Sequence, residues 1–140
     1  MITIKVPGTP IAKARPKFFR KGNHVGTYNP QETKESRFLW EVSQQLKRGF
    51  KPFTCPLQVS VYFVMPIPKG LSKKQREQIN CEIKHTKKPD VSNMLKFVED
   101  CLNGVAWKDD SQIVSIHAHK CYGESPHTEI SICNYDEEEL

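Results

Sequence analysis

Apolar and polar residues alternate along four short segments of the chain, as they do in strands that bury one face. Residues 57–65, LQVSVYFVM, give the strongest signal because β-branched and aromatic side chains dominate them. The pattern predicts strands at residues 2–6, 57–65, 112–120 and 127–133.

Apolar residues recur every three to four positions in two other segments, a spacing typical of amphipathic helices. Residues 31–48 are one such segment. Residues 93–103 are the other, with Gly104 as a natural stop. The apolar stripes of these two predicted helices contain Phe38, Leu39, Val42 and Leu46 in the first, and Met94, Leu95, Phe97, Val98, Cys101 and Leu102 in the second.

Two further segments are polar and basic. Residues 13–30 mix Lys and Arg with three aromatic residues, and we expect a loop or a hairpin there. Residues 72–85 begin with Ser72, which Gln75 follows three positions later, and this pair is typical of a capping box at a helix start. We expect a short, mobile helical flap over these residues.

The segments follow the order strand, basic loop, helix, strand, flap, helix, strand, strand. This order predicts a single α+β domain in which two helices cover a mixed or antiparallel sheet. A chain of 140 residues is long enough to bury such a core. We place the domain at residues 1–135 and expect an acidic C-terminal tail at residues 136–140.

Composition excludes several classes of protein. No apolar run approaches the roughly 18 residues that a membrane-spanning helix needs, and the N-terminus lacks the apolar segment of a signal peptide. We therefore expect a cytoplasmic protein with no membrane partner. Five cysteines without a C-x-x-C pair favour reduced thiols over a disulfide framework or a zinc ribbon.

The charge is positive and unevenly spread. The chain has 21 Lys and Arg against 16 Asp and Glu, and four of the acidic residues stand together at 136–139. The remainder therefore carries 21 positive charges against 12 negative ones. Such a surplus favours a polyanionic partner, most often nucleic acid, and is also found on ordinary solvated surfaces.

Carboxylates gather around the second predicted helix, inside this basic sequence. Asp90 precedes the helix, Asp109 and Asp110 follow it, and Lys96 lies one turn into it. If the strand at 112–120 pairs back toward the helix start, these carboxylates meet and can share a Mg²⁺ ion, which prefers oxygen ligands. Lys96 would then neutralise charge on a phosphate. The alternative is structural, with Asp90 as a helix cap and Asp109–Asp110 as the start of a turn.

The same stretch resembles the RusA family of Holliday-junction resolvases, small endonucleases common in phages and prophages. The family pattern is K-P-D-x-D-N-x-x-K, then D-A-L-N-G, an aromatic residue and D-D-x-Q-I. This chain has KPDVSNMLK, DCLNG and VAWKDDSQIV at the corresponding places. Nearer the N-terminus, GTPIAKARPKF and TYNPQETKE resemble the family segments G-x-P-x-x-K-x-R-P-R-F and Y-x-P-x-x-T.

The resemblance implies a homodimeric α+β nuclease that requires Mg²⁺, with Mn²⁺ as a substitute, and that resolves four-way DNA junctions by paired nicks. Asp90 and Asp110 match essential carboxylates of the motif, Asp109 matches an acidic neighbour, and Lys96 matches the motif Lys. The expected metal ligands are Asp90, Asp110 and Asp109. The basic residues expected to contact DNA phosphates are Lys13, Arg15, Lys17, Arg20, Lys87, Lys88 and Lys120.

Ser92 departs from the pattern because the family has its second Asp at this place. A neutral hydroxyl is a far weaker Mg²⁺ ligand than a carboxylate, although Ser is a good helix N-cap. Three explanations follow. The site works with a weakened metal, with Asp109, Glu99 or Asp100 supplying charge; or the protein binds junctions and cuts them poorly; or the chain is an engineered inactive variant.

Three function classes are therefore open on the sequence alone. The first is a junction-selective, Mg²⁺-dependent endonuclease. The second is a catalytically weak or inactive protein that binds branched DNA. The third is a general binder of single-stranded nucleic acid. Cleavage of a four-way junction separates the first from the second, and equal affinity for junctions and linear strands would favour the third.

Overall fold

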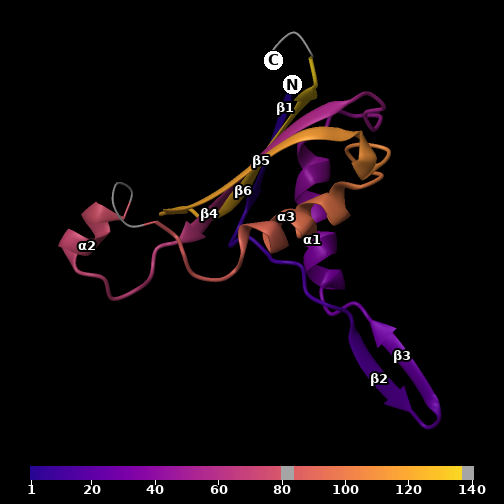
Figure 1. Cartoon of the computed structure of the whole chain (residues 1–140), viewed down its shortest axis with the longest axis horizontal. Coiled ribbons are helices and arrows are strands. Elements are labelled where there is room, and N and C mark those ends of the chain that lie inside the picture. The colour runs from indigo at the N-terminus through magenta and orange to yellow at the C-terminus, as the bar shows by residue number, and fades with distance from the viewer. Residues whose placement is uncertain (80–83, 137–140) are drawn as a thin grey trace.

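A four-stranded mixed sheet forms the centre of the computed structural model, which describes residues 1–79 and 84–136 (Figure 1). The strand order is β1-β6-β4-β5. Strand β6 pairs antiparallel with both β1 and β4, whereas β5 pairs parallel with β4. The bounds are β1 Ile2–Pro7, β4 Leu57–Pro66, β5 Ile113–Gly123 and β6 His127–Asn134.

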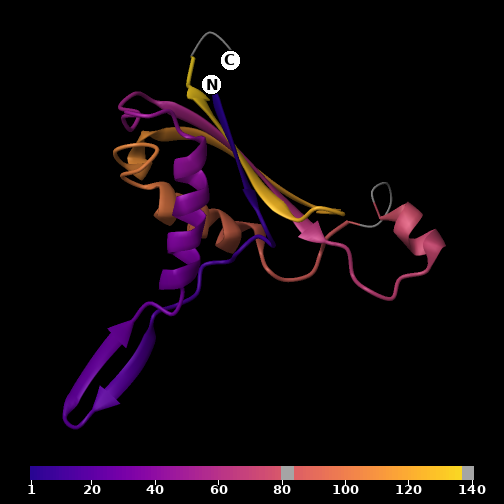
Figure 2. The ribbon, with the colours of Figure 1, turned by 180° about the vertical axis from the view of Figure 1, so that it is seen from behind.

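One face of this sheet is buried. Strand β4 alternates most cleanly, with every second side chain from Leu57 to Met65 inside the core. Helices α1 (Glu32–Gln45) and α3 (Val91–Leu102) cover this face and lie on the same side of the sheet in both views (Figures 1 and 2). Phe38 of α1 and Phe97 of α3 meet edge to face, with ring centroids 5.5 Å apart, and so join the two helices.

The opposite face of the sheet is polar. Tyr62 of β4 points outward and lies between His117 and His119 of β5, with both ring centroids 6.1 Å from its own. Both histidines therefore lie on the same side of β5, which is the edge strand of the sheet. No helix in the described parts of the chain is long and apolar enough to cross a membrane.

Two elements project from this body. Strands β2 (Lys17–Lys21) and β3 (His24–Tyr28) form an antiparallel hairpin that points away from the sheet (Figure 2). The short helix α2 (Lys73–Gln78) lies at the far end of the molecule from this hairpin (Figure 1). Its Ser72 and Gln75 form the predicted capping box.

The α+β architecture with a mixed sheet and two covering helices is confirmed. Several boundaries differ from the sequence predictions; strand β5, for example, runs to Gly123 and not to residue 120, and the helices differ as follows. Helix α1 ends at Gln45, and α2 ends at Gln78, with the predicted flap residues 80–83 outside the described residues. Helix α3 begins at Val91 with Asp90 as its N-cap, so Ser92 is the second helical residue and not the cap.

Candidate active site

Asp90 lies at the N-terminal end of α3 in an exposed position. Its carboxylate makes no capping hydrogen bond to the helix, so it is available to a ligand. Ala12, Lys88, Pro89, Asp90 and Asn93 line a shallow pocket of about 450 Å³ beside it. The site at this end of α3 therefore combines an unengaged carboxylate with an exposed lysine.

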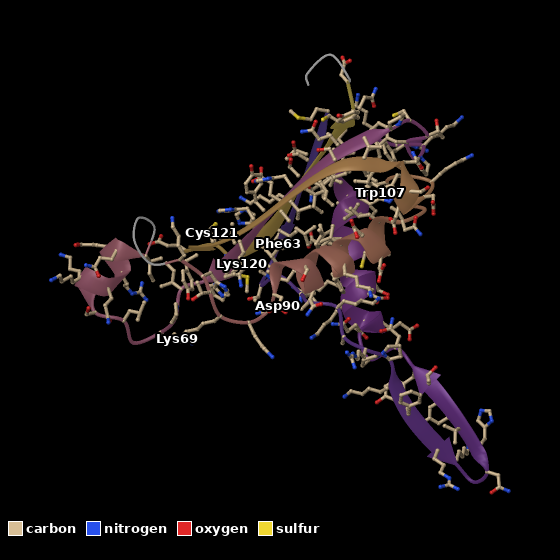
Figure 3. All side chains as sticks on the ribbon, in the orientation of Figure 1. Phe63, Lys69, Asp90, Trp107, Lys120 and Cys121 are labelled. Carbon is tan, nitrogen blue, oxygen red and sulfur yellow. The ribbon has the colours of Figure 1, made fainter. Side chains whose placement is uncertain are left out.

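Lys120 of β5 fixes the segment that leads into Asp90. Its ammonium donates to the carbonyl oxygens of Lys87, at 2.8 Å, and Pro89, at 3.1 Å. Figure 3 shows Lys120 and Asp90 near the same end of α3. The sequence predicts that Lys120 contacts a DNA phosphate. In the structure its ammonium is instead hydrogen-bonded to the backbone of the segment before α3. Lys87 and Lys88 remain exposed beside it.

Asp110 lies at the other end of α3, held by Trp107. The fully buried Trp107 ring donates from Nε1 to Oδ1 of Asp110 at 2.6 Å. The turn after α3 is closed by the Gly104 N–H, which donates to the Trp107 carbonyl at 2.7 Å. Gly104 has φ +79°, a backbone conformation that favours glycine. Asp110 is thus attached to the core of the domain.

Glu99, one of the three residues expected to supply charge in place of the missing motif Asp, lies at this acidic end near Asp110. Burial raises the pKa of Glu99, and the negative charges of Asp110 and Asp100 raise it further. The three carboxylates therefore repel one another, and a bound cation would relieve that repulsion. The helix spacing alone indicates that Glu99 lies near Asp100, whereas its position near Asp110 depends on the turn that follows α3.

Asp109 has a local structural role. Its carboxylate accepts from the backbone N–H of Ser111 at 3.2 Å and from the Ser111 hydroxyl, and its own N–H donates to Gln112. The Ser111 hydroxyl and the Ser111 N–H lower the pKa of Asp109. These bonds cap the short 3₁₀ turn Asp110–Gln112, which positions Asp110 at the start of β5.

The two ends of α3 are far apart within one chain. Helix α3 has 12 residues, which corresponds to about 18 Å of rise. Strand β5 starts beside Asp110 and reaches the carbonyl of Pro89 only at Lys120, so it runs back along α3. Figure 3 shows Asp90 at one end of α3 and Trp107 at the other.

The expected metal ligands Asp90, Asp109 and Asp110 therefore do not fit a single metal ion in one chain. Within residues 1–79 and 84–136, no three His, Cys, Asp or Glu side chains are placed to hold a metal ion together. The premise that the strand at 112–120 would return its acidic start to Asp90 is wrong, because its far end lies there instead. Each end of α3 offers carboxylate oxygens on its own.

Lys96 and Ser92 both lie on the exposed side of α3. They are four residues apart, so they follow one another along a single helix face that continues to Glu99 and Asp100. Lys96 takes part in no ion pair among the described residues. Its ammonium is therefore available to a phosphate.

The basic segment 11–31 contains no acidic residue. It consists of the β2–β3 hairpin and the short stretches that precede and follow it. The buried Gln31 anchors it by donating to the Ala12 carbonyl at 2.8 Å and accepting from the Ala14 N–H at 2.9 Å. The Lys13 N–H donates to the carbonyl of Asn93 at 2.9 Å. The base of the hairpin is thus attached to the first turn of α3, close to Asp90.

The predicted phosphate contacts on this segment differ in their availability. Lys13 forms ion pairs with Asp100 at 3.2 Å and Glu35 at 3.5 Å. Partial burial lowers the pKa of Lys13, but the hydrogen bonds and charges of Asp100 and Glu35 outweigh it and raise the pKa. Arg15, Lys17 and Arg20, by contrast, are exposed along the hairpin.

The hairpin also carries exposed aromatic side chains. The Phe19 ring lies across Gly26, where a Cβ atom would come within 2.5 Å of it. Tyr28 and His24 flank the same ring, with centroids 6.4 and 6.3 Å away. Phe18 points to the other face and is 78% exposed. Phe18 is therefore free to contact a ligand, whereas Phe19 is partly covered by its neighbours in the hairpin.

Comparison with known proteins agrees with these features. The sequence model of the family described as "Endodeoxyribonuclease RusA" matches residues 7–133. An "Uncharacterized protein YqaN" from Bacillus subtilis (strain 168) is 31% identical over 134 residues, and the match covers 94% of each chain. The match of the family spans both the basic hairpin and the two acidic ends of α3.

Proposed function

Because the chain belongs to the RusA endodeoxyribonuclease family, we propose that it is a structure-selective, Mg²⁺-dependent endonuclease that resolves four-way DNA junctions by paired nicks. Nucleases of this family generally depend on a divalent metal ion. The observation that carries the proposal is the attachment of an acid-free basic hairpin to the first turn of α3, beside the unengaged carboxylate of Asp90.

The hairpin and the lysines around Asp90 account for binding. Arg15, Lys17 and Arg20 on the hairpin and Lys87 and Lys88 at α3 are exposed and can contact phosphates. Such contacts give affinity without reading the base sequence. A duplex arm bound along the hairpin would bring its backbone to the pocket beside Asp90.

Phosphodiester hydrolysis needs an attacking water and stabilisation of negative charge on the phosphate. A divalent ion held by carboxylate oxygen at one end of α3, either at Asp90 or at Asp110 with Glu99 nearby, would polarise the phosphoryl group when present. Lys96, in the second turn of α3, would neutralise charge on the phosphate oxygens. Trp107 keeps Oδ1 of Asp110 engaged and so fixes which direction its Oδ2 faces.

The test is nicking of a synthetic four-way junction in the presence of Mg²⁺. Asp110→Asn preserves an oxygen that can accept from Trp107 and removes only the charge, so the fold should survive. We expect nicking to fall by about 10²–10³-fold with junction binding retained. Glu124→Gln changes an exposed acid in the turn before β6 and serves as the matched control. Equal cutting by Asp110→Asn would refute the assignment.

A second function is supported by Ser92 itself. This position is exposed, neutral and not the helix cap, so the chain lacks a carboxylate there without a structural gain. A protein that binds branched DNA and cuts it weakly or not at all fits this observation. It predicts salt-sensitive junction binding without cleavage under Mg²⁺ or Mn²⁺. Ser92→Asp would restore nicking if the missing carboxylate is the cause.

A further inference from the structure

The direction of the β2–β3 hairpin is not fixed by packing in the core. None of the residues in its two strands is buried. Both views show the hairpin pointing away from the sheet and the helices (Figures 1 and 2). Its direction relative to α3 therefore depends on the two stretches at its base, residues 11–16 and 29–31.

Glu35 of α1 is bonded to both of these stretches. Its Oε2 accepts from the side-chain amide of Asn29 at 2.9 Å, and its Oε1 lies 3.5 Å from the Lys13 ammonium. Asn29 in turn accepts through Oδ1 from the Gln31 N–H at 2.9 Å. One carboxylate thus joins the stretch before β2 to the stretch after β3.

Lys13 extends this connection to α3. Its ammonium lies 3.2 Å from Oδ2 of Asp100, and its backbone N–H donates to the Asn93 carbonyl at 2.9 Å. Asp100 lies on the exposed face of α3 that also carries Lys96. The base of the hairpin, α1 and this face of α3 therefore form one connected unit.

The exposed cations that can contact phosphates fall into two groups. These are Arg15, Lys17 and Arg20 on the hairpin, and Lys87, Lys88 and Lys96 at α3. Two binding surfaces add their binding energies only if one ligand reaches both at once. The angle between the hairpin and α3 therefore decides which shape of DNA gains from both groups.

We propose that Glu35 is a positioning residue that holds the hairpin at a fixed angle to α3 and thereby makes the protein prefer branched to linear DNA. A junction has arms that diverge, so one arm can follow the hairpin while another lies against α3. A linear duplex has no second arm and engages one group of cations at a time. The selectivity part of this inference rests on the proposed nuclease function.

Loss of the Glu35 carboxylate frees the base of the hairpin. A junction that needs both groups of cations must then order the hairpin as it binds, which costs affinity. A linear duplex that uses one group does not bear this cost. We expect the ratio of junction affinity to linear-duplex affinity to fall by about fivefold in Glu35→Ala.

The ratio is measured by fluorescence anisotropy without divalent metal ions, so that no DNA is cut. Glu32→Ala is the matched control, because it removes the same charge from the same first turn of α1. Glu32 is exposed and takes part in no ion pair within residues 1–79 and 84–136. Its ratio should equal that of the wild type. An unchanged ratio in Glu35→Ala, or an equal fall in both variants, would overturn the proposal.

A double substitution tests whether Lys13 and Glu35 act through one connection. Lys13→Met should also lower the ratio, because it removes the ammonium that Glu35 and Asp100 share. In the double variant with Glu35→Ala, the fall should be smaller than the product of the two single falls, since both changes break the same contact. A fall equal to that product would contradict a shared connection.

Hydrogen exchange tests the connection without DNA. The amides of Lys13, Ala14 and Gln31 are hydrogen-bonded at the base of the hairpin, and they should exchange faster in Glu35→Ala, whereas those of β4 should not change. Equal exchange in Glu35→Ala and the wild type would overturn the role of Glu35. If the wild-type chain does not nick junctions but the affinity ratio still depends on Glu35, only the nuclease function is refuted.

Discussion

The two ends of α3 hold the same type of side chain in opposite surroundings. Asp90 is exposed, makes no capping bond and has lysines for neighbours. Asp110 is attached to a fully buried tryptophan and lies near two other carboxylates. The position of the Asp90 carboxylate is determined by the loop that precedes α3, and that of the Asp110 carboxylate by a hydrogen bond to the core residue Trp107. Changes at the Asp110 end should therefore alter stability, whereas changes at the Asp90 end should mainly alter activity.

The largest effect is expected for Trp107→Phe. This substitution removes the N–H that Asp110 accepts from and leaves a small cavity in the core. We expect the free energy of unfolding to fall by about 2–4 kcal/mol, together with a loss of nicking. Denaturant titration measures the first quantity.

Trp40→Phe provides the matched control, because Trp40 of α1 is largely exposed. Its effect should stay within about 0.5 kcal/mol. Equal destabilisation by the two substitutions would mean that the hydrogen bond from Trp107 to Asp110 does not contribute to the stability of the fold.

Lys120→Met should have a smaller effect on stability, and it tests the Asp90 end. The substitution keeps an apolar stem and removes the donor to the Lys87 and Pro89 carbonyls. We expect a loss of about 1 kcal/mol and about a tenfold fall in kcat for junction nicking, because the segment that carries Asp90 loosens. Single-turnover kinetics on a saturated junction measure the second effect.

Salt dependence then separates positioning from phosphate binding at Lys120. A positioning residue leaves the slope of log affinity against log salt unchanged, whereas loss of a phosphate contact lowers it by about 1. Lys5→Met, at an exposed position of β1, is the control for a general loss of positive charge. A lower slope for Lys120→Met would return this residue to the set of DNA contacts.

The sequence predicted the elements well because their signals are local. The alternation in 57–65 and the apolar stripe of 93–103 correspond to β4 and α3, and the Ser72–Gln75 pair forms its capping box. Non-local features could not be predicted in the same way. Proximity of Asp90 and Asp110 in the motif suggested proximity in space, but the intervening helix separates them.

The contacts of Gln31 and Lys13 at the base of the hairpin are also non-local and could not be predicted from the sequence pattern. Nothing in the pattern distinguishes Gln31 from other polar residues at a helix start, yet it is buried and holds the basic segment in place. Lys13 was expected to contact DNA because of its neighbours in the sequence. Its ion pairs with Asp100 and Glu35 depend on helices that are distant along the chain.

The smallest expected effect is that of Glu99→Gln, which probes the repulsion at the Asp110 end. Burial and the charges of Asp110 and Asp100 raise the pKa of Glu99 above its ordinary 4.5, so its ionised form opposes folding. The wild-type chain bears this cost at pH values above the raised pKa and loses it as the pH falls below 4.5. Glu99→Gln should therefore be more stable than the wild type at pH 7, by less than about 1 kcal/mol. The difference should disappear on acidification.

Glu124→Gln, at an exposed turn, should show neither change in the same denaturant titrations. A Glu99→Gln chain that is less stable than the wild type at pH 7 would mean that Glu99, Asp100 and Asp110 do not repel one another enough to cost stability.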